Sequence, residues 1–239
     1  MEFLDPNRPK ICFLDDNFFA CENWREIIAE VKAAGKRFQF KQGLDERLLD
    51  DEKIHEMMTW KYEKDWIFAF DNIDDWQIIE SKLKRIAELY PESKRRSKFY
   101  ILCGFDRSGK YDNEFWLSDI ENVFKRCFLL AKHSALPYIM QYEKVDESEY
   151  RGLYIVMASW CNQPNIFKKF DFATFAMCKG MPKAAYKKYK RDIDEYLSDG
   201  GKKGVEWRRL EEFQKRHREI AEEWFHIVPD SLREGKARR

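Results

Sequence analysis

The sequence lacks the features that would assign it to a membrane, to the secretory route or to a common class of metal site. No apolar run approaches the roughly 18 residues of a membrane-spanning helix, and the first ten residues contain no signal-peptide core. The six cysteines are widely spaced, since the closest two, Cys12 and Cys21, are nine positions apart. No C-x-x-C motif for zinc or redox chemistry is present, and we expect a cytoplasmic protein with reduced thiols.

The sequence also lacks the short motifs of several large enzyme classes. It has no phosphate-binding G-x-x-x-x-G-K-[ST] loop, no dinucleotide-binding G-x-G-x-x-G, no H-E-x-x-H and no G-x-S-x-G. The four histidines all fall on predicted helices, away from the predicted strand ends. These absences argue against metal–histidine hydrolysis and against Ser–His catalysis. The net charge of +1 gives no sign of a nucleic-acid partner for the molecule as a whole.

The sequence does contain a regular alternation of short apolar strands and amphipathic helices. Apolar residues make up 44% of the chain and aromatic residues 16%, which is enough for a large core. Helix-like periodicity fills the segments between the strands, and Asn23 is a suitable cap for the first helix. The predicted strands cover residues 11–14, 37–40, 66–70, 98–103 and 137–142. This order predicts an α/β fold with a parallel sheet and right-handed crossovers.

The pattern changes after Arg151, where the sequence predicts helices alone. A helix from Arg151 is broken at Pro164, and the glycine-rich segment 200–204 joins the last two helices. The predicted helices cover residues 151–163, 171–180, 182–197 and 205–225. We therefore expect two domains, a (βα) domain over residues 1–160 and a helical C-terminal extension over residues 161–239.

Acidic and amide side chains follow the predicted strands, at the point where each strand ends. Because the carboxyl ends of parallel strands meet at one edge of a sheet, these side chains are predicted to form one polar rim. A carboxylate between a strand and a helix can instead cap the helix, and for each acid alone both interpretations stay open. Capping does not explain Asp71, since Asp74 and Asp75 are better placed to cap the next helix, nor Asp15 and Asp16, which come six or more residues before the predicted helix at Trp24. The predicted rim comprises Asp15, Asp16, Asn17, Gln42, Asp45, Arg47, Asp71, Asn72, Asp106 and Glu143.

Three segments together resemble the body of the radical S-adenosylmethionine (radical SAM) superfamily. They are FLDDNFF at 13–19, FQFKQGLDERLLDDEK at 38–53 and WIFAFDN at 66–72. The resemblance covers roughly Pro9 to Tyr142, and more weakly the segment RGLYIVMASWCNQP at 151–164. It implies a partial TIM-type barrel of six βα units, of which this sequence has five and lacks the first. It also implies S-adenosylmethionine and a [4Fe–4S] cluster as cofactors, with the substrate unknown.

The unit that this sequence lacks is the one that holds the cluster in the family. There, three thiolates of a C-x-x-x-C-x-x-C loop bind the iron, and none of the six cysteines here has that spacing. Three interpretations follow. The chain is a fragment of a longer enzyme and inactive alone, a separate chain supplies the cluster unit, or the domain has lost the chemistry and kept a binding cleft.

The resemblance implies roles for five residues after the first two predicted strands. Asp16 and Asn17 match the positions that meet the amino group of the cofactor's methionine, where a carboxylate or an amide suits an ammonium group. Gln42, Asp45 and Arg47 match the polar turn after the next strand. Arg47 would pair with the cofactor carboxylate or with the substrate.

The resemblance further implies roles at the ends of the later strands. Asp71 matches the strand end near the cofactor ribose, where a carboxylate can accept hydrogen bonds from the ribose hydroxyls. Gly104 would let the backbone approach the adenosine closely. Tyr138 and Met140 would flank the adenine. The resemblance names no catalytic residue and no metal ligand in this chain.

Two other functions stay open. A cluster-less binding module would contact nucleic acid through the basic segment Lys183–Arg191 or the basic tail REGKARR, although both also suit a solvated helix face and a frayed end. A barrel hydrolase would use paired carboxylates such as Asp16 and Glu143, without iron or cofactor. Cys161, in the segment WCNQP, is either a buried structural thiol or a group that acts near an open barrel mouth.

Overall fold

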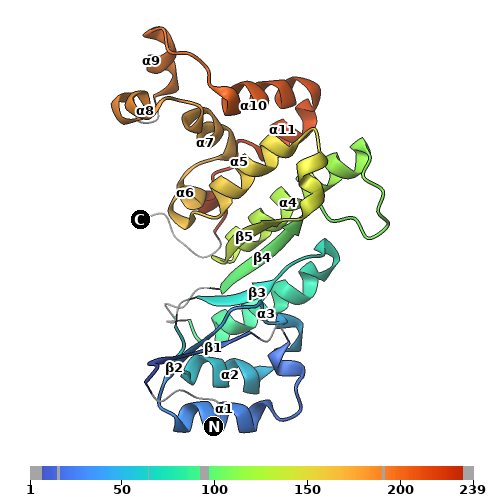
Figure 1. Cartoon of the computed structure of the whole chain (residues 1–239), viewed down its shortest axis with the longest axis vertical. Coiled ribbons are helices and arrows are strands. Elements are labelled where there is room, and N and C mark those ends of the chain that lie inside the picture. The colour runs from blue at the N-terminus through green and yellow to red at the C-terminus, as the bar shows by residue number, and fades with distance from the viewer. Residues whose placement is uncertain (1–6, 15–16, 64, 92–96, 190–191, 234–239) are drawn as a thin grey trace. The chain divides into compact units, whose positions relative to one another are not determined.

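The computed structural model describes residues 7–14, 17–63, 65–91, 97–189 and 192–233 (Figure 1). Its described strands form two small parallel sheets and do not close into a barrel, so the chain has a mixed α/β fold. The predicted α/β class is thereby confirmed. The described part divides into two compact units. The first comprises residues up to 100 together with 133–136, and the second comprises 101–132 together with the residues from 137 onward.

The first unit alternates strands with helices, as the sequence predicts. Strand β4 belongs to this unit up to Tyr100. Short 3-10 helices follow three of the strands, namely η1 (Phe18–Ala20), η2 (Glu46–Leu48) and η3 (Ile73–Asp75). The α-helices are α1 (Trp24–Ala33), α2 (Asp51–Thr59) and α3 (Trp76–Leu89). The strands are β1 (Lys10–Phe13), β2 (Arg37–Phe40), β3 (Trp66–Ala69) and β4 (Ser97–Cys103).

Side-chain caps begin three of these helical segments, and at η2 the Asp45 carboxylate accepts from the Arg47 amide at 3.1 Å. The Asp50 carboxylate accepts a hydrogen bond from the Lys53 amide at 2.8 Å, which satisfies one free N–H of α2. Asn72, and not Asp74 or Asp75, caps the helical segment after β3, because its side-chain oxygen accepts from the Asp74 amide at 3.1 Å. Capping therefore accounts for Asn72 in the predicted polar rim.

The strands of the first unit run parallel and in chain order. Strand β1 pairs with β2 so that Lys10 lies opposite Arg37, and β3 pairs with β4 so that Trp66 lies opposite Ser97. Two parallel bridges, Phe38 to Tyr62 and Leu44 to Phe68, place β2 and the turn after it beside β3 and the residues just before it. The carboxyl ends of these strands therefore share one edge, which we call the carboxyl edge of the first unit.

An aromatic cluster forms the core of the first unit. Phe38 and Phe40 are 2% and 0% exposed, because the alternation of a strand places both on the same face. Between ring centroids, Phe38 lies 5.1 Å from Trp60, and Phe40 lies 6.2 Å from Tyr62. Tyr62 stacks on Trp66 at 3.9 Å. Burial of an aromatic side chain contributes about 1.5–3 kcal/mol, so this cluster is a main source of the unit's stability.

The second unit begins with the rest of β4, and after β5 its described residues form only helices. Its strand β5 is Leu136–Gln141, of which Leu136 counts with the first unit. The helices are α4 (Asn113–Lys132), α5 (Arg151–Cys161), α6 (Pro164–Lys169), α7 (Phe172–Lys179), α8 (Lys183–Tyr189), α9 (Ile193–Ser198), α10 (Val205–Arg216) and α11 (Arg218–Trp224), with 3-10 helices η4 (Glu143–Glu147) and η5 (Pro229–Leu232).

The sequence predicted two long continuous helices for the second unit, and both predictions were wrong, because each segment forms two shorter helices. The segment 182–197 forms α8 and α9, because the Asp192 carboxylate accepts from the Glu195 amide at 2.8 Å and so begins a new helix. The segment 205–225 is broken at His217, whose φ of −133° and ψ of 59° are not helical. The break accompanies a contact of 2.9 Å between the His217 ring and the Tyr150 hydroxyl.

Helix packing in the second unit centres on Trp160. Its indole N–H donates to the Phe170 carbonyl at 3.0 Å, and its ring lies 4.8 Å from Phe167 and 6.0 Å from Phe124. The predicted boundary near residue 160 falls here, inside α5. None of the helices in the described residues combines the length and the apolar character that crossing a bilayer would require.

Candidate functional site

The carboxyl edge of the first unit contains most of the residues that the resemblance singles out. Asn17, Gln42 and Asp71 are exposed there, each just past the end of a strand. Asp45 and Arg47 lie in the turn that follows β2. Asp16, together with Asp15, lies outside the described residues, so its predicted role stays a prediction.

Asp45 and Arg47 form the best-defined polar contact at this edge. The guanidinium of Arg47 donates from Nε to Asp45 Oδ1 at 2.8 Å and from Nη2 to Oδ2 at 2.9 Å. A third contact joins Arg47 Nη1 to Asp75 Oδ2 at 3.5 Å. The hydrogen bonds from Arg47 are the main cause that holds the pKa of Asp45 below its usual range. Two-pronged pairs of this kind are directional, so the turn presents two fixed opposite charges.

The backbone of this turn lies close to the neighbouring strand. A side chain at Gly43 would place its Cβ 3.0 Å from the Phe68 carbonyl carbon, so only glycine fits without a shift of the backbone. The next residue, Leu44, donates its amide to the Ile67 carbonyl at 2.8 Å. Backbone contacts therefore fix the first half of the Q-G-L-D-E-R segment, at Gly43 and Leu44, directly before the charged residues Asp45 and Arg47.

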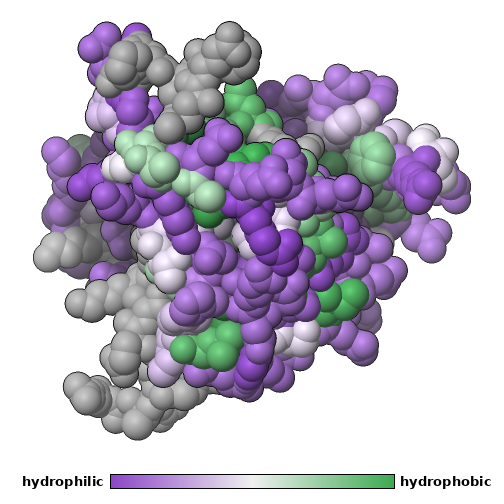
Figure 2. All heavy atoms as spheres, turned by 90° about the horizontal axis from the view of Figure 1, so that it is seen from below, coloured by the Kyte–Doolittle hydropathy of each residue, from purple (hydrophilic) through white to green (hydrophobic). Residues whose placement is uncertain are grey.

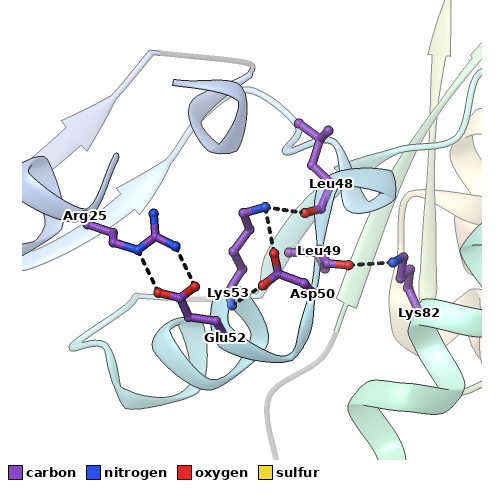
Figure 3. A network of polar contacts seen from close by, with 7 residues as sticks. All are labelled: Arg25, Leu48, Leu49, Asp50, Glu52, Lys53 and Lys82. Carbon is purple, nitrogen blue, oxygen red and sulfur yellow. Dashed lines mark hydrogen bonds and ion pairs between the residues drawn. The ribbon is translucent and has the colours of Figure 1, made fainter. Parts of the chain in front are cut away.

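Cationic side chains fix the chain immediately after the turn (Figure 3). The ammonium of Lys53 donates to the Leu48 carbonyl at 2.8 Å, and that of Lys82 donates to the Leu49 carbonyl at 2.5 Å. Glu52 pairs with Arg25 at 2.6 Å, which joins α2 to α1. The two lysine contacts satisfy backbone carbonyl groups that accept no hydrogen bond within a described helix or sheet, so they stabilise the loop from which Arg47 extends.

Glu46 lies between the two charged residues and is buried, with 4% of its surface exposed. Burial raises the pKa of its carboxyl from 4.5 to about 8. The charges of Asp45 and Asp75 raise it further, while its own backbone N–H and the Arg47 guanidinium act in the opposite direction. At neutral pH the carboxyl is therefore mostly protonated. A buried acid with such a pKa can hold or deliver a proton near neutral pH.

The second unit contains the three remaining residues to which the resemblance gives a role, Gly104, Tyr138 and Met140, of which Met140 lies exposed on β5. Gly104 follows β4 with a φ of +74°, and a Cβ there would lie 2.2 Å from Val145 Cγ2. Its amide donates to the Asp119 carboxylate at 2.8 Å. Tyr138 lies on β5 and is half-buried. The backbone conformation and the close packing therefore require glycine at position 104, independently of any contact with the adenosine of a cofactor.

A buried carboxylate of α4 fixes the end of β4 in the second unit. Asp119 accepts from the Tyr154 hydroxyl at 2.6 Å as well as from Gly104. Burial raises the pKa of Asp119, and the hydrogen bonds from Tyr154 and Gly104 oppose that rise. Asp106, by contrast, accepts from the Ser108 and Lys110 amides of its own loop, so local turn formation accounts for this member of the predicted rim.

Sequence reasoning missed Glu46, Asp75 and Asp119 as members of polar sites. Asp119 has a readable signal, since it lies three residues after Trp116 and four before Val123, within an apolar helical stripe. An acid in such a stripe is buried and needs partners. Glu46 has no comparable signal, because a 3-10 turn shows no period over three residues.

The cysteines of this chain do not fit an iron–sulfur cluster. Cys103, Cys127, Cys161 and Cys178 are buried, and no group of three His, Cys, Asp or Glu side chains in the described residues could hold a metal ion. The Sγ atoms of Cys127 and Cys161 lie 3.6 Å apart in the core of the second unit. Burial raises the pKa of Cys161 well above its usual value, as expected of an inert structural thiol.

Comparison with known proteins does not assign a function to this chain, so a proposal must rest on the chain's own residues. A scan against protein-family models, a search of curated proteins and a search of solved structures each give no match to this chain.

Proposed function

We propose that the carboxyl edge of the first unit binds S-adenosylmethionine, and that the chain is the larger part of a radical SAM-type enzyme. The observation that supports this most is the fixed pair of Asp45 and Arg47 in the Q-G-L-D-E-R turn. The amino-acid end of S-adenosylmethionine has an ammonium and a carboxylate on one carbon. A neighbouring carboxylate and guanidinium complement both charges.

The charge balance of this edge agrees with the proposal. Asp45, Asp71 and Asp75 supply three carboxylates, Arg47 and the exposed Lys41 supply two cations, and buried Glu46 is mostly neutral at pH 7. S-adenosylmethionine has a sulfonium in addition to its zwitterionic end, so its net charge is positive. An edge with an excess of carboxylates attracts such a ligand.

The order of the strands also suits the proposed family. Parallel strands that follow one another in the chain and in space are the arrangement from which a partial (βα) barrel is built. In the proposed architecture the first βα unit of the barrel is not part of this sequence. A bound cofactor would supply a 5′-deoxyadenosyl radical only at a [4Fe–4S] cluster, and the thiols present here do not fit one. The proposal therefore concerns binding by this chain, with the cluster supplied by other residues.

Calorimetric titration of the full chain with S-adenosylmethionine tests the proposal. Arg47→Gln removes the guanidinium, and we expect about tenfold weaker binding, from the loss of a charged hydrogen bond of about 1.5 kcal/mol. Arg85→Gln is a matched control, because Arg85 pairs with Asp51 at 2.6 Å elsewhere in the same unit. If the wild-type chain takes up no S-adenosylmethionine at millimolar concentration, or if both variants bind equally well, the proposal is wrong.

A further inference from the structure

The opposite edge of the first unit has the reverse charge balance. A groove of about 830 Å³ lies at the amino ends of the strands, lined by Lys10, Gly35, Arg37, Lys61, Tyr62 and Glu63. Its lining includes three cations and one carboxylate, an excess of two positive charges. The carboxyl edge has an excess of carboxylates, so the two edges suit ligands of opposite charge.

The three cations form a row across neighbouring parallel chains. Lys10 lies directly opposite Arg37 in the pairing of β1 with β2. The bridge from Phe38 to Tyr62 places Lys61, one residue earlier, opposite Arg37. Neighbouring strands lie about 4.8 Å apart, so the row is about 10 Å long. We call Lys10, Arg37 and Lys61 the cationic row.

The row faces away from the aromatic core. Phe38 and Tyr62 are buried on the core face. Arg37 and Lys61, which directly precede them in the chain, are exposed, and so is Lys10, which lies opposite Arg37. The side chains of Lys10 and Arg37 are 55% and 71% exposed. Apolar packing therefore gives no reason for cations at these three positions.

One carboxylate balances only part of the row. Glu63 lies 2.6 Å from the Lys10 ammonium and 3.6 Å from the Arg37 guanidinium. Its pKa is lowered, chiefly by the hydrogen bond from Lys10, so it is ionised at neutral pH. No described side chain pairs with the Lys61 ammonium. Like charges on adjacent strands repel one another, and the row keeps an excess of two positive charges after Glu63 is counted, so a further anion would be attracted to it.

We propose that the cationic row binds the phosphate groups of a nucleic-acid strand. A chain of phosphodiesters offers successive anions along its length, which suits three cations in a line, whereas a single carboxylate or phosphate would contact one or two. Figure 2 shows that hydrophilic side chains cover most of the molecular face that it draws. This surface is distinct from the basic segment Lys183–Arg191 that the sequence indicated.

The test compares two double variants of the full chain by fluorescence anisotropy with a labelled 12-nucleotide oligo(dT). Arg37→Gln with Lys61→Gln removes two cations from the row. Lys183→Gln with Lys187→Gln removes two exposed cations from α8 and leaves the same net charge. We expect the row variant to bind at least fivefold more weakly at 50 mM salt. Its slope of log affinity against log salt should fall by about 1.4, at about 0.7 per lost phosphate contact.

Several results would overturn the proposal. It is wrong if the wild-type chain does not bind the oligonucleotide at 50 mM salt, or if the α8 variant loses affinity while the row variant keeps it. A second titration, with inorganic tripolyphosphate in place of the oligonucleotide, tests for a small ligand. Binding of tripolyphosphate without binding of the oligonucleotide would assign the row to a small polyphosphate ligand instead. Circular dichroism of each variant confirms that a lost signal is not lost folding.

Discussion

Replacing Glu46 with glutamine should stabilise the first unit in a strongly pH-dependent manner. The folded carboxyl has a pKa of about 8, against 4.5 when unfolded. Because the folded pKa is raised, the stability present below pH 4.5 is lost as the pH rises through 8. The loss is about 1.4 kcal/mol for each unit between the two values, which amounts to about 3 kcal/mol at pH 7. Glutamine has nearly the same shape and does not ionise, so the variant avoids this loss.

Urea denaturation followed by tryptophan fluorescence at pH 5, 6, 7 and 8 measures the effect. The variant should exceed the wild type by less than about 1 kcal/mol at pH 5 and by about 3 kcal/mol at pH 7. Glu52→Gln is the matched control, because Glu52 is exposed and the Arg25 guanidinium lowers its pKa. That control should give no gain as the pH rises. Parallel stability curves for the wild type and the Glu46 variant would refute the buried, protonated carboxyl.

Three further substitutions test the packing of the second unit by thermal or urea unfolding. Gly104→Ala should cost about 2–4 kcal/mol, from a left-handed backbone and a Cβ only 2.2 Å from Val145. Gly109→Ala, at the same φ of +74° but with no atom within 4 Å, should cost only the conformational part, about 1–2 kcal/mol. An equal loss in both would contradict the close contact at Gly104. Tyr154→Phe should cost about 1–3 kcal/mol, because Asp119 loses a hydrogen bond in a buried site. An unchanged stability would show that the 2.6 Å bond contributes nothing.

The buried carboxyl of Glu46 is unfavourable to the fold at neutral pH, and its place is consistent with a role in the proposed function. It lies at the carboxyl edge, between Asp45 and Arg47, where the proposed ligand would meet the chain. Rules of stability are broken most often at functional sites, because function there requires groups that folding alone would avoid. A stabilised Glu46→Gln chain that binds S-adenosylmethionine less well would support this interpretation.

The row of cations at the amino edge breaks a local rule in a similar way. Each of Lys10, Arg37 and Lys61 looks ordinary in the sequence, since a charged residue beside a strand is usually only a solvated one. Their alignment depends on the pairing register of three separate segments. A register shift of one residue would place the same cations on the other face, against the aromatic core.

Much of the fold could be read from the sequence, because it depends on local periodicity. The apolar run at β3 and the alternating phenylalanines of β2 predict buried strands, and the period of 3.6 predicts the helices between them. The breaks within the last two predicted helices could not be read in this way. The backbone at His217 departs from helical geometry where its ring meets Tyr150, a partner 67 positions earlier in the chain.

The polar sites show the same division between local and distant causes. By itself, the sequence determined the class of the fold, the strand ends and the polar residues that follow them, since neighbours in the chain decide which side chains come just after a strand. Only the tertiary structure decided which of these residues have partners. It paired Arg47 with Asp75, buried Glu46 and aligned the three cations of the row. Such contacts join segments tens of residues apart, and burial and charge depend on those distant neighbours rather than on local pattern.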